Sequence, residues 1–338
     1  MERKLLISFF VALILCYAVY AEPNKEDNSS SQITVKECVL EDDINKQDKN
    51  GKTALIRAAE SGDLAKVREL IKRGANLNIQ DNDGDTALKE ASYKGHDKIV
   101  KLLVNKGANL ELRNNYGRTS LINAAQTGHT KIVEILINKG AKLDIQDKYG
   151  VTALMRAAYH GYPKVVSILL DKGANLDITD NDGVMPLSHA AAAGHKEIVE
   201  ILLNKDVSID AQDKYGNTAL IFAAHRGYKD IVEILVNRGA NLDLQGQCGK
   251  TALIFATGEG YKEIVRILVD NGAKWNIKDR FGNTALMIAR NKFYKSDDYK
   301  DIVTILSDQG ADLDTQNEDD ETSLNYEADG YKGSCKIN

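Results

Sequence analysis

Apolar residues along this chain recur at helical spacing inside a longer period. Within Asp213–Gln245, the segment Lys229–Asn237 places its aliphatic residues, from Ile231 to Leu235, on one side of a helix. The segment Ala219–His225 contains good helix formers and no helix breaker, so it predicts a second, shorter helix. Helices this short are not stable alone, and each must bury its apolar side against neighbouring elements.

Polar and glycine positions mark the ends of these two helices. Thr218 stands where an N-cap residue belongs, and Gly227 and Gly239 follow the predicted helices as stop signals. Before the first helix, Tyr215 and Gly216 fall in a predicted tight turn. The segment is therefore a unit of turn, helix, second helix and extended connection.

This unit is repeated. Seven further copies match it, and each begins 33 residues after the one before. A fixed period of this length is typical of stacked supersecondary units rather than of one closed core. At intervals of 33 residues, the turn glycine recurs from position 51 to position 282. At the same interval a leucine recurs from 55 to 286 and an alanine from 58 to 289. In chain order, copies 1 to 8 begin at Asp48, Asp81, Asn114, Asp147, Asp180, Asp213, Gly246 and Asp279.

Two blocks of the unit resemble the ankyrin repeat family. The family's T-P-L-H-x-A motif stands here as Thr-Ala-Leu-x-x-Ala, and its second block stands almost unchanged from Gly128-His129 to Gly140-Ala141. The resemblance covers residues 48–316. It implies an all-α fold, an ankyrin-repeat solenoid of eight full helix-turn-helix units with hairpin-like turns and partial capping units at both ends.

The beginning of the chain predicts export. Residues 1–21 combine a charged start, the apolar run Leu5–Val19 and small residues around Ala21, as in a cleaved signal peptide. An uncleaved membrane anchor is less favoured because the run is short for a bilayer. A lipoprotein signal ending at Cys16 is less favoured still, because the residue before such a cysteine is normally small and here it is Leu15. We expect a periplasmic or secreted protein that contacts a membrane only if this segment is retained or lipidated.

The rest of the chain divides around the repeats. Residues 22–32 are polar and serine-rich and are predicted to be a disordered linker. Residues 33–47 carry half a unit and are predicted to form the N-terminal half-repeat cap. The eight repeats fill 48–316, and residues 317–338 begin a ninth unit that we interpret as a partial C-terminal cap and tail.

Three copies depart from the pattern. Copy 5 has Met185 in place of the capping threonine and Asp206-Val207 in place of Gly-Ala, where aspartate can adopt the left-handed conformation at some cost. Copy 7 begins with Gly246 and carries Gly258 within its first helix. Copy 8 is five residues longer within Asn291–Tyr299, which predicts a protruding loop.

Candidate catalytic and metal-binding residues are explained better by the repeat. His96, His129 and His195 occupy one repeat position, so we expect scaffold roles for them, and no histidine lies near a cysteine at zinc spacing. The triplets Gly51-Lys52-Thr53 and Gly249-Lys250-Thr251 lack the leading glycine of a phosphate-binding loop. The sequence therefore predicts no cofactor, no metal, no small-molecule substrate and no catalysis.

Removal of the signal peptide would leave three cysteines. Cys38, Cys248 and Cys335 are an odd number, which predicts a free thiol or an intermolecular bridge. Cys38 and Cys248 lie six copies apart and cannot meet within one solenoid, because packed helices are about 8–10 Å apart. A bond between Cys248 and Cys335 through the tail is left open, and no base is available to activate a catalytic thiol.

The resemblance also implies where a partner would bind. Ankyrin partners usually lie in the concave groove formed by the hairpin tips and the exposed side of each first helix. Aromatic and cationic residues there suit an interface, because they bury large areas and keep a polar group. The alternative, that each tyrosine only packs against its neighbour's tip, stays open. The predicted partner-binding residues are Tyr93, Tyr116, Tyr149, Tyr159, His160, Tyr215, His225, Arg226 and Phe281.

Composition narrows the class of partner. The formal net charge of −5 argues against nucleic acid, since phosphate binding relies on clustered Lys and Arg. We expect an exported scaffold that binds a protein partner. The alternatives are a self-assembling, envelope-associated solenoid joined through its ends, and a secreted effector that binds host proteins. An enzyme is disfavoured because almost no chain is left outside the repeats.

Overall fold

The computed structural model describes residues 43–311, and that part of the chain folds as eight consecutive pairs of α-helices. It contains no β-strand among these residues, which confirms the expected all-α solenoid. The helices are α2 (Ala54–Ser61), α3 (Leu64–Lys72), α4 (Ala87–Lys94), α5 (Asp97–Asn105), α6 (Ser120–Gln126), α7 (Thr130–Asn138), α8 (Ala153–His160), α9 (Pro163–Asp171), α10 (Pro186–Ala193), α11 (Lys196–Leu203), α12 (Ala219–Arg226), α13 (Lys229–Asn237), α14 (Ala252–Glu259), α15 (Lys262–Asp270), α16 (Ala285–Asn291) and α17 (Asp297–Asp308).

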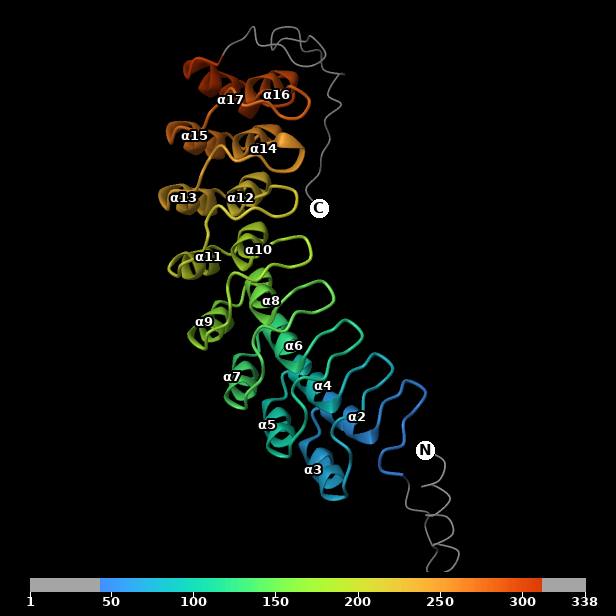
Figure 1. The fold of residues 1–338 in the computed structure, drawn as a ribbon. Coiled ribbons are helices and arrows are strands. Elements are labelled where there is room, and N and C mark those ends of the chain that lie inside the picture. Colours follow the sequence, from blue (N-terminus) through green and yellow to red (C-terminus); the bar gives the residue numbers. More distant parts are fainter. Residues whose placement is uncertain (1–42, 312–338) are drawn as a thin grey trace, which may run out of the picture. The chain divides into compact units, whose positions relative to one another are not determined.

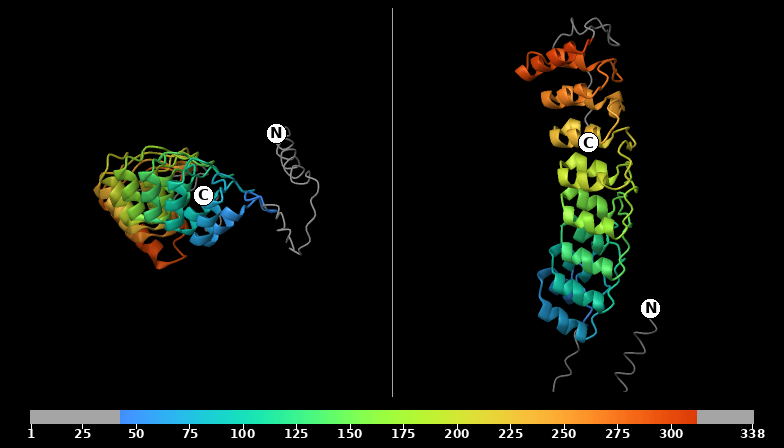
Figure 2. Two further views of the ribbon diagram at one scale, coloured as in Figure 1. Left: turned by 90° about the horizontal axis from the view of Figure 1, so that it is seen from below. Right: turned by 90° about the vertical axis from the view of Figure 1, so that its left-hand side faces the viewer.

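The pairs stack in chain order. The first helices, α2 to α16, lie in one row, and the second helices, α3 to α17, lie in another (Figure 1). Each first helix packs on the first helix of the next copy and on the second helix of its own copy. The turns that connect the copies gather along one edge of the stack (Figures 1 and 2). In the described part of the chain, the main helix contacts lie within a copy or between neighbouring copies, as expected for a solenoid.

The ends of the first helices follow the predicted signals. The Thr218 hydroxyl accepts a hydrogen bond from the Ile221 amide at 3.3 Å, and Gly227 ends α12 with φ 78°. Met185 offers no side-chain cap in copy 5. There Pro186 occupies the first helical position, where its missing N–H leaves one fewer donor to satisfy.

The core lies between the two rows of helices. In copy 6, Leu220 and Ala223 are buried on α12, and Val232 and Leu235 are buried on α13. Burying a leucine or valine side chain contributes about 1.5–3 kcal/mol. The same positions are buried in copies 1 to 7, and in copy 8 the equivalent of Val232, Val303, is partly buried, so each unit is stabilised by packing on its neighbours.

Hydrogen bonds join the turns of successive copies. At each junction but one, an amide at the tip donates to the tip carbonyl of the preceding copy; Lys148 to Tyr116 at 2.9 Å is an example. The exception is the step from copy 6 to copy 7, where the Gln247 amide donates to the Asn217 side chain instead. Within a turn, the Asp213 carboxylate accepts from the Tyr215 and Asn217 amides. This ladder holds the tips together through the backbone.

The histidines that recur between the helices have scaffold roles, as predicted. The Nε2 atoms of His96, His129 and His195 lie 2.9–3.1 Å from backbone carbonyls of the preceding copy. A carbonyl only accepts, so Nε2 is the protonated nitrogen and donates. The tyrosines at this position pack their rings against the preceding glycine, as Tyr162 does on Gly128.

Two of the irregular copies differ from expectation. Asp206 does not adopt a left-handed conformation, since Cys248 is the single non-glycine residue with positive φ within residues 43–311. Copy 5 avoids that cost because α11 ends early, at Leu203. In copy 8 the extra residues form the turn 292–296 and an additional turn of helix at the start of α17, so only part of the insertion protrudes.

Residues 1–42 and 312–338 lie outside the described part of the chain. The predicted signal peptide, linker, most of the N-terminal cap and the C-terminal cap fall there. The described end of the N-terminal cap binds copy 1: the Asn45 side chain accepts from the Asn76 amide, and the Gln47 side chain donates to the Gln80 carbonyl. Between residues 43 and 311, no helix is long and apolar enough to cross a membrane.

Candidate partner-binding surface

We call the surface formed by the turn tips and the exposed ends of the first helices the inner face. All nine predicted partner-binding residues lie on it. Five tyrosines on it keep 44–55% of their surface exposed, namely Tyr93, Tyr116, Tyr149, Tyr159 and Tyr215. His160 and Arg226 are also exposed, whereas His225 and Phe281 are half-buried.

The tip aromatics contact their own copies rather than one another. The Arg118 guanidinium lies 5.4 Å from the centre of the Tyr116 ring, and that of Arg280 lies 5.2 Å from the Phe281 ring. Within the described residues no ring of one tip contacts the ring of the next. The backbone ladder joins the tips, and the tip tyrosines Tyr116, Tyr149 and Tyr215 stay 52–55% exposed.

Charged residues of copies 1 and 2 neutralise one another. The Lys52 ammonium lies 2.7 Å from the Glu60 carboxylate and 2.9 Å from that of Glu90. Burial alone would lower the pKa of Lys52, but the hydrogen bonds to both glutamates raise it above its ordinary value. Burial raises the pKa of Glu90, and Lys52 opposes that shift. These charged groups therefore join copy 1 to copy 2.

Copy 2 also contains a lysine inside the core, which sequence reasoning missed. Lys89 is fully buried, with its ammonium 2.5 Å from the Gly84 carbonyl and 3.6 Å from the Asp85 carboxylate. Burial lowers the pKa of Lys89 to about 8. Its repeat position gives the signal, because every other copy except copy 5, which has Ser188, carries isoleucine or methionine there, among them Ile56, Ile122, Met155, Ile221 and Ile254.

Copies 3 and 4 bury a carboxylate between arginines. The Asp147 side chain is fully buried and lies 2.6 Å from an Arg156 nitrogen and 3.6 Å from one of Arg118. It also accepts hydrogen bonds from the Tyr149 and Val151 amides. These arginines therefore hold the turn of copy 4 and are not available as isolated cations.

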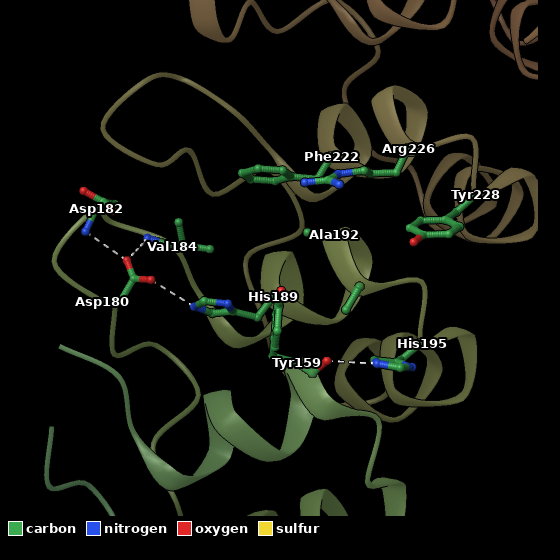
Figure 3. A pocket seen from close by; sticks show the side chains of 11 residues that line it. Tyr159, Asp180, Asp182, Val184, His189, Ala192, His195, Phe222, Arg226 and Tyr228 are labelled. Carbon is green, nitrogen blue, oxygen red and sulfur yellow. Dashed lines mark hydrogen bonds and ion pairs between the residues drawn. The ribbon is translucent and has the colours of Figure 1, made fainter. Parts of the chain in front are cut away.

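Copy 5 opens a hollow in the inner face. Its first helix ends with Ala192 and Ala193, where copy 4 has Tyr159 and His160. The missing side chains leave a cavity of about 530 Å³ between copies 4 and 6 (Figure 3). The lining residues are Tyr159, Asp180, Asp182, Val184, His189, Ala192, Ala193, His195, Phe222, Arg226 and Tyr228.

The polar groups of this hollow are partly paired. His189 Nε2 lies 3.0 Å from the Asp180 carboxylate. Burial alone would raise the pKa of Asp180, but hydrogen bonds from His189 and from backbone amides hold it below its ordinary value. Among the residues the structure describes, no carboxylate lies within 4.0 Å of the Arg226 guanidinium. No cation of that part of the chain lies within 4.0 Å of the Asp182 carboxylate.

A smaller hollow of about 190 Å³ adjoins the first on the tip side. It shares Asp182, Val184 and Phe222 with the larger one and is also lined by Tyr215. The two together run from the end of α8 to the tip of copy 6. Sequence reasoning identified Tyr159, Arg226 and Tyr215 here but not the hollow, whose signal is a pair of alanines where neighbouring copies carry large side chains.

Metal-ligating side chains are not clustered in the described part of the chain. Within residues 43–311, no cluster of three or more His, Cys, Asp or Glu side chains could hold a metal ion. Cys248 at the tip of copy 7 takes part in a disulfide bond, and the other cysteines of the chain lie outside the described residues. The inner face therefore offers aromatic surface, charge and a hollow.

Comparison with known proteins agrees with this architecture. The family model described as ankyrin repeats (3 copies) matches residues 15–114, 107–180, 172–246 and 238–317. The comparison with curated proteins gives no match. Because the matches cover nearly the whole chain and the helix pairs stack as described, this protein belongs to the ankyrin repeat family.

Proposed function

We propose that this chain is an exported, non-catalytic scaffold that binds a protein partner through its inner face. Ankyrin repeats generally mediate protein–protein interaction. The observation that carries the proposal is the set of five half-exposed tyrosines on copies 2, 3, 4 and 6 of one face. Tyrosine is a favoured anchor at interfaces because its ring buries a large area while its hydroxyl stays hydrogen-bonded.

Rigidity of the tips favours such binding. The amide-to-carbonyl ladder between successive turns fixes the backbone that carries Tyr116, Tyr149 and Tyr215. A preorganised surface loses little conformational entropy when it binds, so more of the contact energy contributes to affinity. Export is the part of the proposal that rests on the signal-peptide pattern of residues 1–21.

The test replaces two tip tyrosines. A partner is first identified by cross-linking and mass spectrometry, and its affinity is then measured for the double variant Tyr149→Ser, Tyr215→Ser. We expect the affinity to fall by about tenfold or more, as for aromatic anchors that each contribute over about 1 kcal/mol. The melting temperature should change little, because both rings are more than half exposed.

The matched control is Tyr294→Ser. Tyr294 is 89% exposed but lies in the inserted turn of copy 8, two copies beyond Tyr215 along the solenoid. This variant should bind as the wild type does. A double variant that loses stability while its affinity is unchanged would show that the tyrosines pack the scaffold and do not bind.

A further inference from the structure

We infer that the hollow of copy 5 receives an apolar side chain of the protein partner, and that a carboxylate next to that side chain pairs with Arg226. This inference rests on the proposed function and adds the chemistry of the partner segment. It follows from three properties of the hollow: its shape, its unpaired charge and its continuity with the row of tyrosines.

The shape is set by side-chain size. Ala192 and Ala193 of α10 line the hollow with small side chains. Val184 and Phe222 add apolar surface, and Tyr159 lies on the side toward copy 4 (Figure 3). A cavity of about 530 Å³ is large enough for an aromatic or large aliphatic side chain and part of its backbone. Burial of such a side chain is the main source of energy at protein interfaces.

A positive charge remains open at the rim of the hollow. Arg226 is exposed at the rim of the hollow and has no ion pair among the described residues, and Glu259, at the equivalent position of copy 7, lies beyond 4.0 Å. The exposed Asp182 carboxylate also has no cation within 4.0 Å among the described residues, and the Lys214 ammonium binds the carbonyl of Asn181 beside it. An arginine favours a carboxylate partner because its planar fork can donate two hydrogen bonds.

Continuity with the tyrosine row favours a protein segment as the occupant. Tyr159 belongs both to that row and to the wall of the hollow, and Tyr215 lines the adjoining smaller hollow. A segment that contacts the tips of copies 3 and 4 can therefore reach Arg226 without leaving the inner face. The exposed residues Tyr159, Asp182 and Arg226 line the hollow, so it is open to solvent on the inner face.

The test uses short peptides with the full chain. The probes are acetyl-Phe-Asp-amide, acetyl-Phe-Asn-amide and acetyl-Phe-Lys-amide, and dissociation constants are measured by ligand-observed NMR. We expect the Asp peptide to bind about threefold to tenfold more tightly than the Asn peptide, as for a partly exposed charge-assisted contact. The Lys peptide should bind most weakly. Equal affinity of the Asp and Asn peptides, or tightest binding of the Lys peptide, would overturn the inference.

Two variants locate the peptide. Arg226→Gln should remove the preference for Asp over Asn. The double variant Ala192→Tyr, Ala193→His places the residues of copy 4 at the same positions of α10, where it should fill the hollow and abolish binding of all three peptides. The control Glu60→Tyr, Ser61→His adds the same pair at the end of α2, away from the hollow, and should bind the peptides as the wild type does.

These outcomes separate the inference from the function on which it rests. If the filled variant binds the peptides like the wild type, the hollow is not the site and the inference fails. The proposed function fails independently, when a partner's affinity is unchanged by Tyr149→Ser, Tyr215→Ser. Because Arg226 is exposed and its variant keeps the helix former glutamine, its result is interpretable even if the filled variant does not fold.

Discussion

The inner faces of copies 1–4 and of copies 5–6 have the same backbone arrangement but differ in how their charged side chains are paired. In copies 1–4, charged side chains contact other side chains of the scaffold: Lys52 binds Glu60 and Glu90, and Lys94, at the position equivalent to Arg226, lies over the Tyr93 ring. In copies 5–6, two alanines open a hollow and Arg226 stands at its rim without an ion pair among the described residues. The first region uses charge to hold the scaffold, and the second leaves charge available to another molecule.

One repeat position shows the difference directly. In copy 4 the first residue, Asp147, binds Arg156, nine residues later. In copy 5 the first residue, Asp180, binds His189, which occupies the position equivalent to Arg156. The smaller imidazole leaves room beside the turn, and it lines the hollow. A solenoid can therefore change its binding surface copy by copy, because each unit packs only on its neighbours.

The largest effect should come from the buried carboxylate of copy 4. Asp147→Ala removes the partner of Arg156 and the acceptor of two turn amides, so we expect the free energy of unfolding to fall by about 3 kcal/mol. Urea unfolding followed by circular dichroism measures it. The matched change in the open region is Asp182→Ala, which removes an exposed carboxylate and should cost less than about 0.5 kcal/mol. Equal losses in the two variants would contradict the comparison.

A smaller effect of opposite sign is expected for the buried lysine of copy 2. Lys89→Met puts the residue of copy 4 into an apolar position, and at pH 7 it should raise the free energy of unfolding by about 2–3 kcal/mol. The pKa of Lys89 is about 8 in the folded chain and has its ordinary value of 10.5 in the unfolded chain.

The pH dependence gives this prediction its control. Above the unfolded pKa, Lys89 is neutral in both states and costs nothing. As pH falls from about 10.5 to about 8, the unfolded chain binds the proton and the folded chain does not, so the wild type loses stability; below about 8 the loss is complete. The advantage of Lys89→Met should therefore shrink between pH 8 and 10. If the advantage of Lys89→Met stays constant between about pH 8 and 10, folding does not lower the pKa of Lys89 and the prediction is wrong.

The smallest effect on stability should come from Arg226. Arg226→Gln removes an exposed cation that has no ion pair in the described part of the chain, and we expect the free energy of unfolding to change by less than about 0.5 kcal/mol. The same urea experiment measures it. A loss above about 1 kcal/mol would mean that Arg226 supports the scaffold as the arginines of copies 3 and 4 do.

Much of the fold followed from the repeat alone. The threonine caps, the glycine stops and the apolar stripes predicted both helices of each copy, because each signal acts within a few residues of the helix that it ends or begins. The expectation for Asp206 was wrong, because shortening α11 was an available alternative to left-handed backbone. The prediction that the inserted residues of copy 8 form a protruding loop was correct only in part, because some of them extend α17.

The candidate surface was predicted less completely. The exposed positions of Tyr149, Tyr159 and Arg226 followed from repeat equivalence, because every copy presents the same positions. The hollow was not foreseen, since it is made by what Ala192 and Ala193 lack and by walls that belong to copies 4 and 6. A cavity between three copies is a property of their packing and not of any one of them.

The sequence by itself determined the helix pairs, their order and the family, because 33-residue periodicity, caps and glycine stops are local signals that repeat along the chain. Only the tertiary structure decided which charges pair across copies, that Lys89 is buried and that copy 5 is hollow. Those properties depend on the distance between side chains from neighbouring copies, and that distance is set when the copies pack.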